Sequence, residues 1–227
     1  CSDVGDSLSY LSNKLTFTTK CESQSLPIIA DFESANIGSS QNYSVPECWD
    51  YVRTGDYAYS IYGYVQGSSS NSNSGTNSFY MYASSSSSYN DTAILITPNF
   101  GDISSKSIVL DMALRTSLLS SNYNAQLFVL AIDSMNNIVD SLSRIDLTQG
   151  FQNTDFNDVS IRLDSMANVH KLGLMVKNNG TLQYINIDDI SITEITDCYY
   201  VQEFNVDSVG TDMAKFSWDQ RFSDSVL

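Results

Sequence analysis

Short runs of alternating or continuous apolar residues, separated by turn-forming residues, follow one another from residue 27 to residue 195. They are rich in Val, Ile, Tyr, Phe and Thr, and none shows the apolar period of about 3.6 residues that marks an amphipathic helix. This pattern predicts an all-β domain. The strands are expected near residues 27–33, 48–53, 57–64, 77–83, 91–97, 106–116, 125–133, 137–146, 157–164, 170–177 and 182–195.

The pattern within the runs indicates how the strands are buried. Residues 107–116 (SIVLDMALRT) and 125–133 (AQLFVLAID) are almost continuously apolar, whereas residues 158–165 (DVSIRLDS) alternate. Two antiparallel sheets packed face to face combine deeply buried strands with strands that are exposed on one face. We therefore predict an antiparallel β-sandwich. The Ser- and Asn-rich stretch 67–78 is expected to be a mobile surface loop.

Charge and residue content exclude several functions. The 227 residues include 11 Lys and Arg against 26 Asp and Glu, a net charge of -15, so we expect no nucleic-acid partner. No apolar run approaches the roughly 18 residues of a membrane-spanning helix, so we expect no membrane insertion by this chain. His170 is the single histidine, which makes a Ser-His-Asp or Cys-His site hard to assemble. We therefore expect no enzyme activity.

The four cysteines are Cys1, Cys21, Cys48 and Cys198, and none belongs to a C-x-x-C pair. An even number of scattered cysteines is typical of disulfides in an oxidising compartment, so we predict a secreted or cell-surface protein. We expect Cys1 to pair with Cys21, because they flank one terminal strand pattern, and Cys48 to pair with Cys198. A cysteine at position 1 also fits a mature lipoprotein, and this alternative stays open.

Both ends of the chain carry strand patterns that lack partners. Residues 8–19 alternate, and residues 201–218 contain two more alternating runs. These ends resemble the last and the first strands of fibronectin type III modules, through residues 16–19 (TFTT), 206–209 (VDSV) and 214–218 (AKFSW). The resemblance implies the end of an upstream module over residues 1–20, a central domain over 21–197 and the start of a downstream module over 198–227.

Five short motifs occur in a distinctive order between residues 30 and 194. They are residues 31–33 (DFE), 46–49 (PECW), 75–83 (GTNSFYMYA), 93–98 (AILITP) and 185–192 (INIDDISI). This order resembles MAM domains and their bacterial relatives, the cleaved-adhesin and choice-of-anchor J modules. The resemblance implies a jelly-roll β-sandwich that serves adhesion or glycan recognition. Two cysteines of MAM domains are absent here, at Ala30 and in the middle strand, which favours the bacterial relatives.

Acidic residues near the first and last strands of the domain form a candidate metal site. Because such strands are often neighbours in a sandwich, Glu33 is expected to approach Asp188 and Asp189, with Asp31 as a further candidate. Like charges this close repel one another unless a cation lies between them, and oxygen ligands favour calcium. The resemblance also implies a structural calcium held by the equivalent acids.

Other uses of the same acids remain open. Asp188 and Asp189 are alternatively surface residues beside a bulge, with Glu33 paired to a lysine. A glycosidase employs two carboxylates as acid and nucleophile, but acids on strand ends are better explained by a structural ion.

Aromatic residues are concentrated in one third of the domain and form a candidate ligand-binding surface. The candidates are Trp49, Tyr57, Tyr59, Tyr62 and Tyr64, and further tyrosines follow nearby at positions 80, 82 and 89. Flat rings stack on the C–H faces of sugars, while their polar tips form hydrogen bonds with hydroxyl groups. Alternatively, the tyrosines form cross-strand pairs and Trp49 fills the core.

Taken together, these features predict a non-catalytic module of a larger secreted or surface protein, with a glycan or a host-surface protein as its partner. Two alternatives remain from the sequence. One is a structural spacer, and the other is an accessory module of a secreted hydrolase whose catalytic domain lies outside this chain.

Overall fold

A computed structural model describes residues 21–54, 60–85, 91–116, 125–147, 151, 155–195, 202–209 and 214–219. Strands dominate these residues, and no described helix is long and apolar enough to cross a membrane. The strands are β1 Ile28–Ala30, β2 Asp50–Arg53, β3 Ile61–Gly67, β4 Asn77–Ala83, β5 Thr92–Ile96, β6 Ile108–Thr116, β7 Ala125–Ile132, β8 Ile138–Leu147, β9 Asn157–Leu163, β10 Lys171–Lys177, β11 Gln183–Glu194, β12 Gln202–Val209 and β13 Ala214–Asp219.

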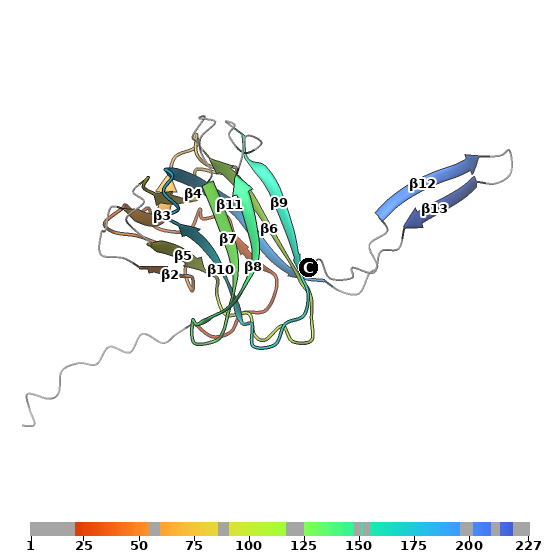
Figure 1. The fold of residues 1–227 in the computed structure, drawn as a ribbon, viewed down its shortest axis with the longest axis horizontal. Helices are drawn as coiled ribbons and strands as arrows, with labels where there is room; N and C mark the ends of the chain where they lie inside the picture. Colours follow the sequence, from red (N-terminus) through yellow and green to blue (C-terminus); the bar gives the residue numbers. More distant parts are fainter. Residues whose placement is uncertain are drawn as a thin grey trace, which may run out of the picture.

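Two antiparallel sheets pack against each other and form a jelly-roll β-sandwich (Figure 1). Sheet A has the strand order β3-β4-β11-β6-β9, and β1 pairs with the far part of β11. Sheet B has the order β2-β5-β10-β7-β8. The predicted all-β sandwich is therefore confirmed. The pairing of β1 with β11 also confirms that the first and last strands of the domain are neighbours.

The core lies between the sheets and is made largely by alternate residues of the strands in sheets A and B. Side chains such as Phe79 of β4, Leu95 of β5 and Leu114 of β6 have no exposed surface. Alternation places their sequence neighbours on the outer faces, because successive side chains of a strand point to opposite sides of the sheet.

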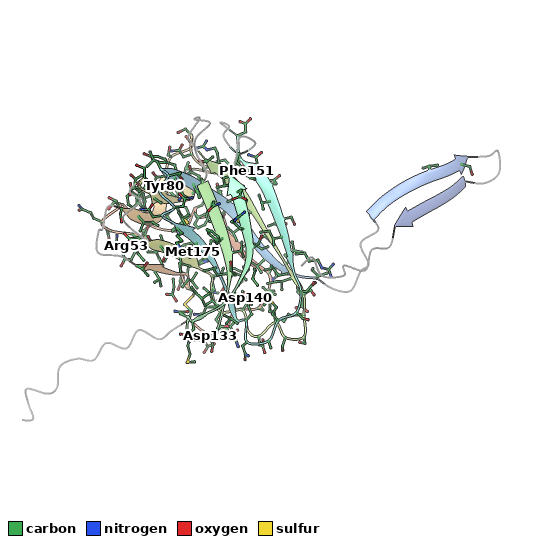
Figure 2. The ribbon with its side chains drawn as sticks, viewed as in Figure 1. Arg53, Tyr80, Asp133, Asp140, Phe151 and Met175 are labelled. Atoms are coloured by element: carbon green, nitrogen blue, oxygen red, sulfur yellow. A yellow bond between two sulfur atoms is a disulfide. The ribbon has the colours of Figure 1, made fainter. Side chains whose placement is uncertain are left out.

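The outer face of sheet B carries a second apolar cluster, which explains the continuously apolar runs in the sequence. Ile94, Ile96, Leu130 and Ile132 are almost fully buried there, and Met175, labelled in Figure 2, packs against them. Gly173 lies at the centre of this face. A Cβ at that position would lie 2.6 Å from Ile132 Cδ1 and 3.0 Å from Ile94 Cγ2, so the missing side chain lets the isoleucines close over β10.

A disulfide joins Cys21 to Cys48, with a Cα–Cα distance of 5.5 Å. The expected pairing of Cys1 with Cys21 and of Cys48 with Cys198 is therefore wrong. The reason is the path of the chain before β1, where Gln24 N donates to Asn99 O at 2.7 Å and holds this segment at the end of sheet B. Cys48 lies two residues before β2 at that end. Cys1 and Cys198 lie outside the described residues.

Strands β12 and β13 pair with each other and confirm the two alternating runs near the end of the chain. A two-stranded hairpin is only marginally stable by itself in water. The strand pattern at residues 8–19 lies outside the described residues.

Candidate functional site

Five tyrosines lie side by side on the outer face of sheet A. Their positions follow from cross-strand register: Tyr62 of β3 pairs with Tyr82 of β4, and Tyr64 pairs with Tyr80. On the other side of β4, Tyr82 pairs with Tyr184 of β11. We call these five residues the tyrosine face, and Figure 2 labels one of them, Tyr80.

The rings of the tyrosine face contact one another closely. Tyr62 and Tyr82 are stacked, with centroids 4.7 Å apart and planes 22° apart. Tyr82 meets Tyr184 edge to face at 5.2 Å, and Tyr64 meets Tyr80 in the same way at 5.5 Å. Such offset and edge contacts are the arrangements that aromatic rings prefer, so the cluster is fixed in place by its own packing.

The tyrosine face is neither closed to solvent nor fully open to it, since all five side chains are half-buried. Burial raises the pKa of Tyr62, Tyr64 and Tyr82 above the ordinary tyrosine value. Their hydroxyl groups therefore stay protonated through the neutral range and can both donate and accept hydrogen bonds.

A polar loop borders the tyrosine face at the β3–β4 turn. This wall loop, residues 68–76, folds over the same outer face. Ser78 Oγ donates to Asn71 O at 2.7 Å, and Asn186 Nδ2 donates to Ser78 Oγ at 3.3 Å. Arg115 of β6 donates to Ser70 O and to Asn71 Oδ1, at 2.8 and 2.6 Å. The aromatic rings of the tyrosine face thus lie beside the hydroxyl and amide groups of the wall loop.

Three carboxylates named in the sequence analysis hold the wall loop. Asp188 Oδ2 accepts hydrogen bonds from Asn73 N at 2.7 Å and Ser74 N at 3.2 Å. Asp189 accepts from the side chains of the same two residues, at 2.7 and 2.6 Å. Glu33 holds the other end of the wall loop, at Thr76. Residues 68–76 thus form a surface loop as predicted, and side chains remote in sequence accept hydrogen bonds from its donors.

Glu33 binds the end of the wall loop at Gly75. Glu33 Oε1 accepts from Thr76 N at 2.8 Å and Asn77 N at 2.6 Å, and these backbone hydrogen bonds lower the pKa of Glu33. Gly75 has a φ of 56°, and a Cβ there would overlap the Glu33 carboxylate. Only glycine combines this backbone conformation with so close an approach.

Asp188 is fully buried, at the start of a bulge in β11 that runs to Ser191. Burial raises its pKa to about 6, and the neighbouring Asp189 charge adds to the shift, although three backbone N–H donors oppose it. Asp189 itself has a φ of 48°, which turns its side chain toward the wall loop. The bulge thus directs two consecutive carboxylates to the same loop.

The predicted acids therefore gather around the wall loop, but their carboxylate oxygens already accept hydrogen bonds from protein groups. Each carboxylate oxygen of Glu33, Asp188 and Asp189 accepts a hydrogen bond, and Asp31 Oδ1 accepts from Glu33 N at 3.1 Å. Across the part of the chain that the structure describes, no group of three or more metal-ligating side chains is positioned to hold an ion. The donor set is nevertheless all oxygen, which suits calcium in kind.

The predicted aromatic candidates divide into two groups. Tyr62 and Tyr64 belong to the tyrosine face. Trp49 is 6% exposed and packs against Phe32 in the core, at 6.2 Å between ring centroids, so its assignment as a binding residue is wrong. Tyr57 and Tyr59 lie outside the described residues.

Sequence reasoning missed Tyr184. It is separated by about a hundred residues from Tyr82, and only the β4–β11 pairing brings the two together. Its signal was the alternation of Tyr184 and Asn186 with the apolar residues of β11, which places both on the outer face.

No family model matches the sequence, and no curated protein matches it. Among solved structures, the chain is similar to the K1 cleaved adhesin domain of Lys-gingipain from Porphyromonas gingivalis, with a TM-score of 0.51 and 14% identity over 75% of this chain and 99% of that one. It is also similar to an arabinose-bound α-L-arabinofuranosidase, with a TM-score of 0.53 and 16% identity over 75% of this chain. The match spans 26% of that enzyme. These likenesses show a shared β-sandwich fold.

Proposed function

We propose that this chain is a non-catalytic carbohydrate-binding or adhesion module that binds its ligand at the tyrosine face. The observation that carries the proposal is the register of five half-buried tyrosines across three neighbouring strands, beside a polar wall loop. Aromatic rings bind the C–H faces of sugars, and protonated tyrosine hydroxyls together with Ser and Asn groups suit sugar hydroxyls. The tyrosine face and the wall loop together supply both the aromatic contacts and the hydrogen bonds.

The outer face of sheet B is less suited to a sugar. Its centre consists of Ile, Leu, Met and Phe side chains that bury one another, and polar residues such as Asp50 and Arg144 lie at the ends of these rows, on the edge strands. Ligand sites combine apolar surface with a few polar groups that fix orientation. Sheet A meets this condition at the tyrosine face.

The acids near the tyrosine face favour binding over hydrolysis. A glycosidase needs two carboxylates that flank the scissile bond and exchange protons with it. Glu33, Asp188 and Asp189 instead accept hydrogen bonds from the wall loop. Their oxygens are therefore engaged in holding the wall loop.

An extracellular location accompanies this proposal. The Cys21–Cys48 disulfide suits an oxidising compartment, and the K1 neighbour is named as an adhesin domain. A host-surface protein as partner and flanking fibronectin-like modules belong to the same proposal, and the β12–β13 hairpin supports the latter as an isolated pair of strands.

Calcium is a second part of the proposal, with Glu33, Asp188 and Asp189 as ligands and Asp31 as a further one. It is supported by two consecutive carboxylates, one of them buried at a cost that a divalent cation would offset. The wall loop and an ion would compete for the same oxygens, so the effect of chelation on stability tests this part.

Binding to a glycan array, followed by titration calorimetry with the best ligand, tests the main proposal. Tyr64→Ala should lower affinity about tenfold, which corresponds to about 1.4 kcal/mol. Tyr43→Ala is the matched control, because Tyr43 is 51% exposed and lies outside the tyrosine face. Equal loss of binding in both variants, or no glycan binding by the intact protein, would contradict the proposal.

A further inference from the structure

We infer that the tyrosine face selects uncharged polysaccharide chains and rejects anionic ones. This inference rests on the proposed function and adds the chemical class of the ligand. It follows from the charges around the face and from the shape that the strand register and the wall loop give it.

No cation is available on the strands that carry the tyrosines. Strands β3, β4 and β11 contain no Lys or Arg. The nearest cation in register is Arg115, whose β6 position pairs with Asn186 of β11. Arg115 is only 5% exposed, and its guanidinium group binds Ser70 O and Asn71 Oδ1 and lies 5.0 Å from the centre of the Phe156 ring. A uronate or sulfate group would therefore find no exposed cationic side chain on strands β3, β4 and β11 to pair with.

Negative charge lies on the same face of sheet A, on the side of the wall loop. Asp188 and Asp189 lie under the wall loop, and Asp189 also lines a shallow hollow on β6 and β9 together with Asp111 and Asp158. The whole chain carries a charge of -15. Such a field repels polyanions at long range and costs nothing to an uncharged chain.

The register also sets the direction of the ligand. Tyr62, Tyr82 and Tyr184 form one row across three strands. Because neighbouring strands lie about 4.8 Å apart, this row is about 10 Å long. The wall loop covers the next part of the face along the strands, over Ser78 and Asp188. A sugar chain therefore lies across the strands, on the tyrosines and beside the loop.

The recognition groups are neutral as well. Tyr62 and Tyr82 remain protonated, because burial raises the pKa of each. Ser70 and Asn71 add neutral side chains on the wall loop, although Ser70 O and Asn71 Oδ1 already accept hydrogen bonds from Arg115. Binding that uses only neutral groups is insensitive to salt, whereas binding of a polyanion weakens as salt screens the charges.

The test uses the full chain against uncharged xylan, galactan and mixed-linkage glucan, and against polygalacturonate and heparin. We expect binding to at least one uncharged polysaccharide, with unchanged affinity from about 0.01 M to about 1 M sodium chloride, over which the Debye length falls from about 30 Å to about 3 Å. We expect no binding to the two polyanions.

A matched pair of variants at Gln66 sharpens the test. Gln66 lies on the same face of β3, two residues beyond Tyr64, and donates to Ser78 Oγ at 3.4 Å. Gln66→Lys adds a cation beside the tyrosines and should produce detectable, salt-sensitive binding to polygalacturonate, which the wild type should lack. Gln66→Glu should leave polygalacturonate unbound. Both variants should keep the affinity for the uncharged ligand.

Two results overturn the inference in distinguishable ways. Salt-sensitive binding of a polyanion that is lost in Tyr64→Ala would refute the selection of uncharged chains and leave the tyrosine face as the binding site. Absence of binding to every glycan would refute the proposed function and the inference with it.

Discussion

Replacing Asp188 by Asn should change how the stability of the protein depends on pH. Asp188 is fully buried, and its pKa is raised from 3.8 to about 6. Because the folded pKa exceeds the unfolded one, this group favours the folded state fully below pH 3.8, and that contribution is lost as the pH rises through about 6. The variant cannot ionise at this position and should lack the dependence.

The expected magnitude follows from the size of the shift. A difference of about two pKa units corresponds to about 3 kcal/mol, of which about 2 kcal/mol falls between about pH 4.5 and pH 7.5. Asn can still accept from Asn73 N and Ser74 N, but its amide group cannot accept from Asp189 N. That loss costs about 1–3 kcal/mol at every pH. The stability difference between variant and wild type should therefore move in favour of the variant as the pH rises.

Urea unfolding at several pH values, with chelator present, measures this difference. Glu33 and Asp133 have lowered pKa values, so each favours the folded state above its unfolded pKa and loses that contribution on further acidification. Their effects are common to both proteins and cancel in the comparison. Parallel curves of unfolding free energy against pH for Asp188→Asn and the wild type would refute the reasoning.

Two further predictions concern the metal and the disulfide. Chelation of calcium at neutral pH should lower the melting temperature of the wild type, and Glu33→Ala should abolish that effect; an unchanged melting curve with chelator removes the calcium proposal. The double replacement Cys21→Ser and Cys48→Ser should lower the free energy of unfolding by about 3–4 kcal/mol, because the bridge closes a loop with a sequence separation of 27. Recovery of free thiols at both positions in peptide mapping would contradict the pairing.

The strands were predictable from sequence because alternation and turn residues act locally. The run at residues 107–116 contains β6, Ile108–Thr116, and the run at 125–133 contains β7, Ala125–Ile132. The predicted strand at 57–64 ends three residues too early, since β3 is Ile61–Gly67; its predicted start lies outside the described residues. There the pairing with β4 extends as far as Gly67 and Asn77, into the polar stretch that was expected to be a loop.

The site was only partly predictable, because its residues come together through long-range pairing. Alternation alone does not say which face of a strand is inside, so Trp49 and Tyr62 looked alike in the sequence although one is in the core and the other on the outer face. The approach of Glu33 to the segment at Asp188 followed from the neighbouring first and last strands. The wall loop occupies the carboxylates of Glu33 and Asp188 through the backbone of residues 73–77. Composition does not encode this backbone conformation.

Strand β11 lies at the centre of sheet A, between β4 and β6, although it is the last strand of the domain in sequence. During synthesis, β4 and β6 therefore leave the ribosome long before the strand that separates them. Folding of this sheet cannot proceed hairpin by hairpin, and closing contacts over such sequence separations makes folding slow. Until residues 183–194 emerge, one edge of β4 and one edge of β6 have no partner strand, and such unpaired edges expose the nascent chain to aggregation.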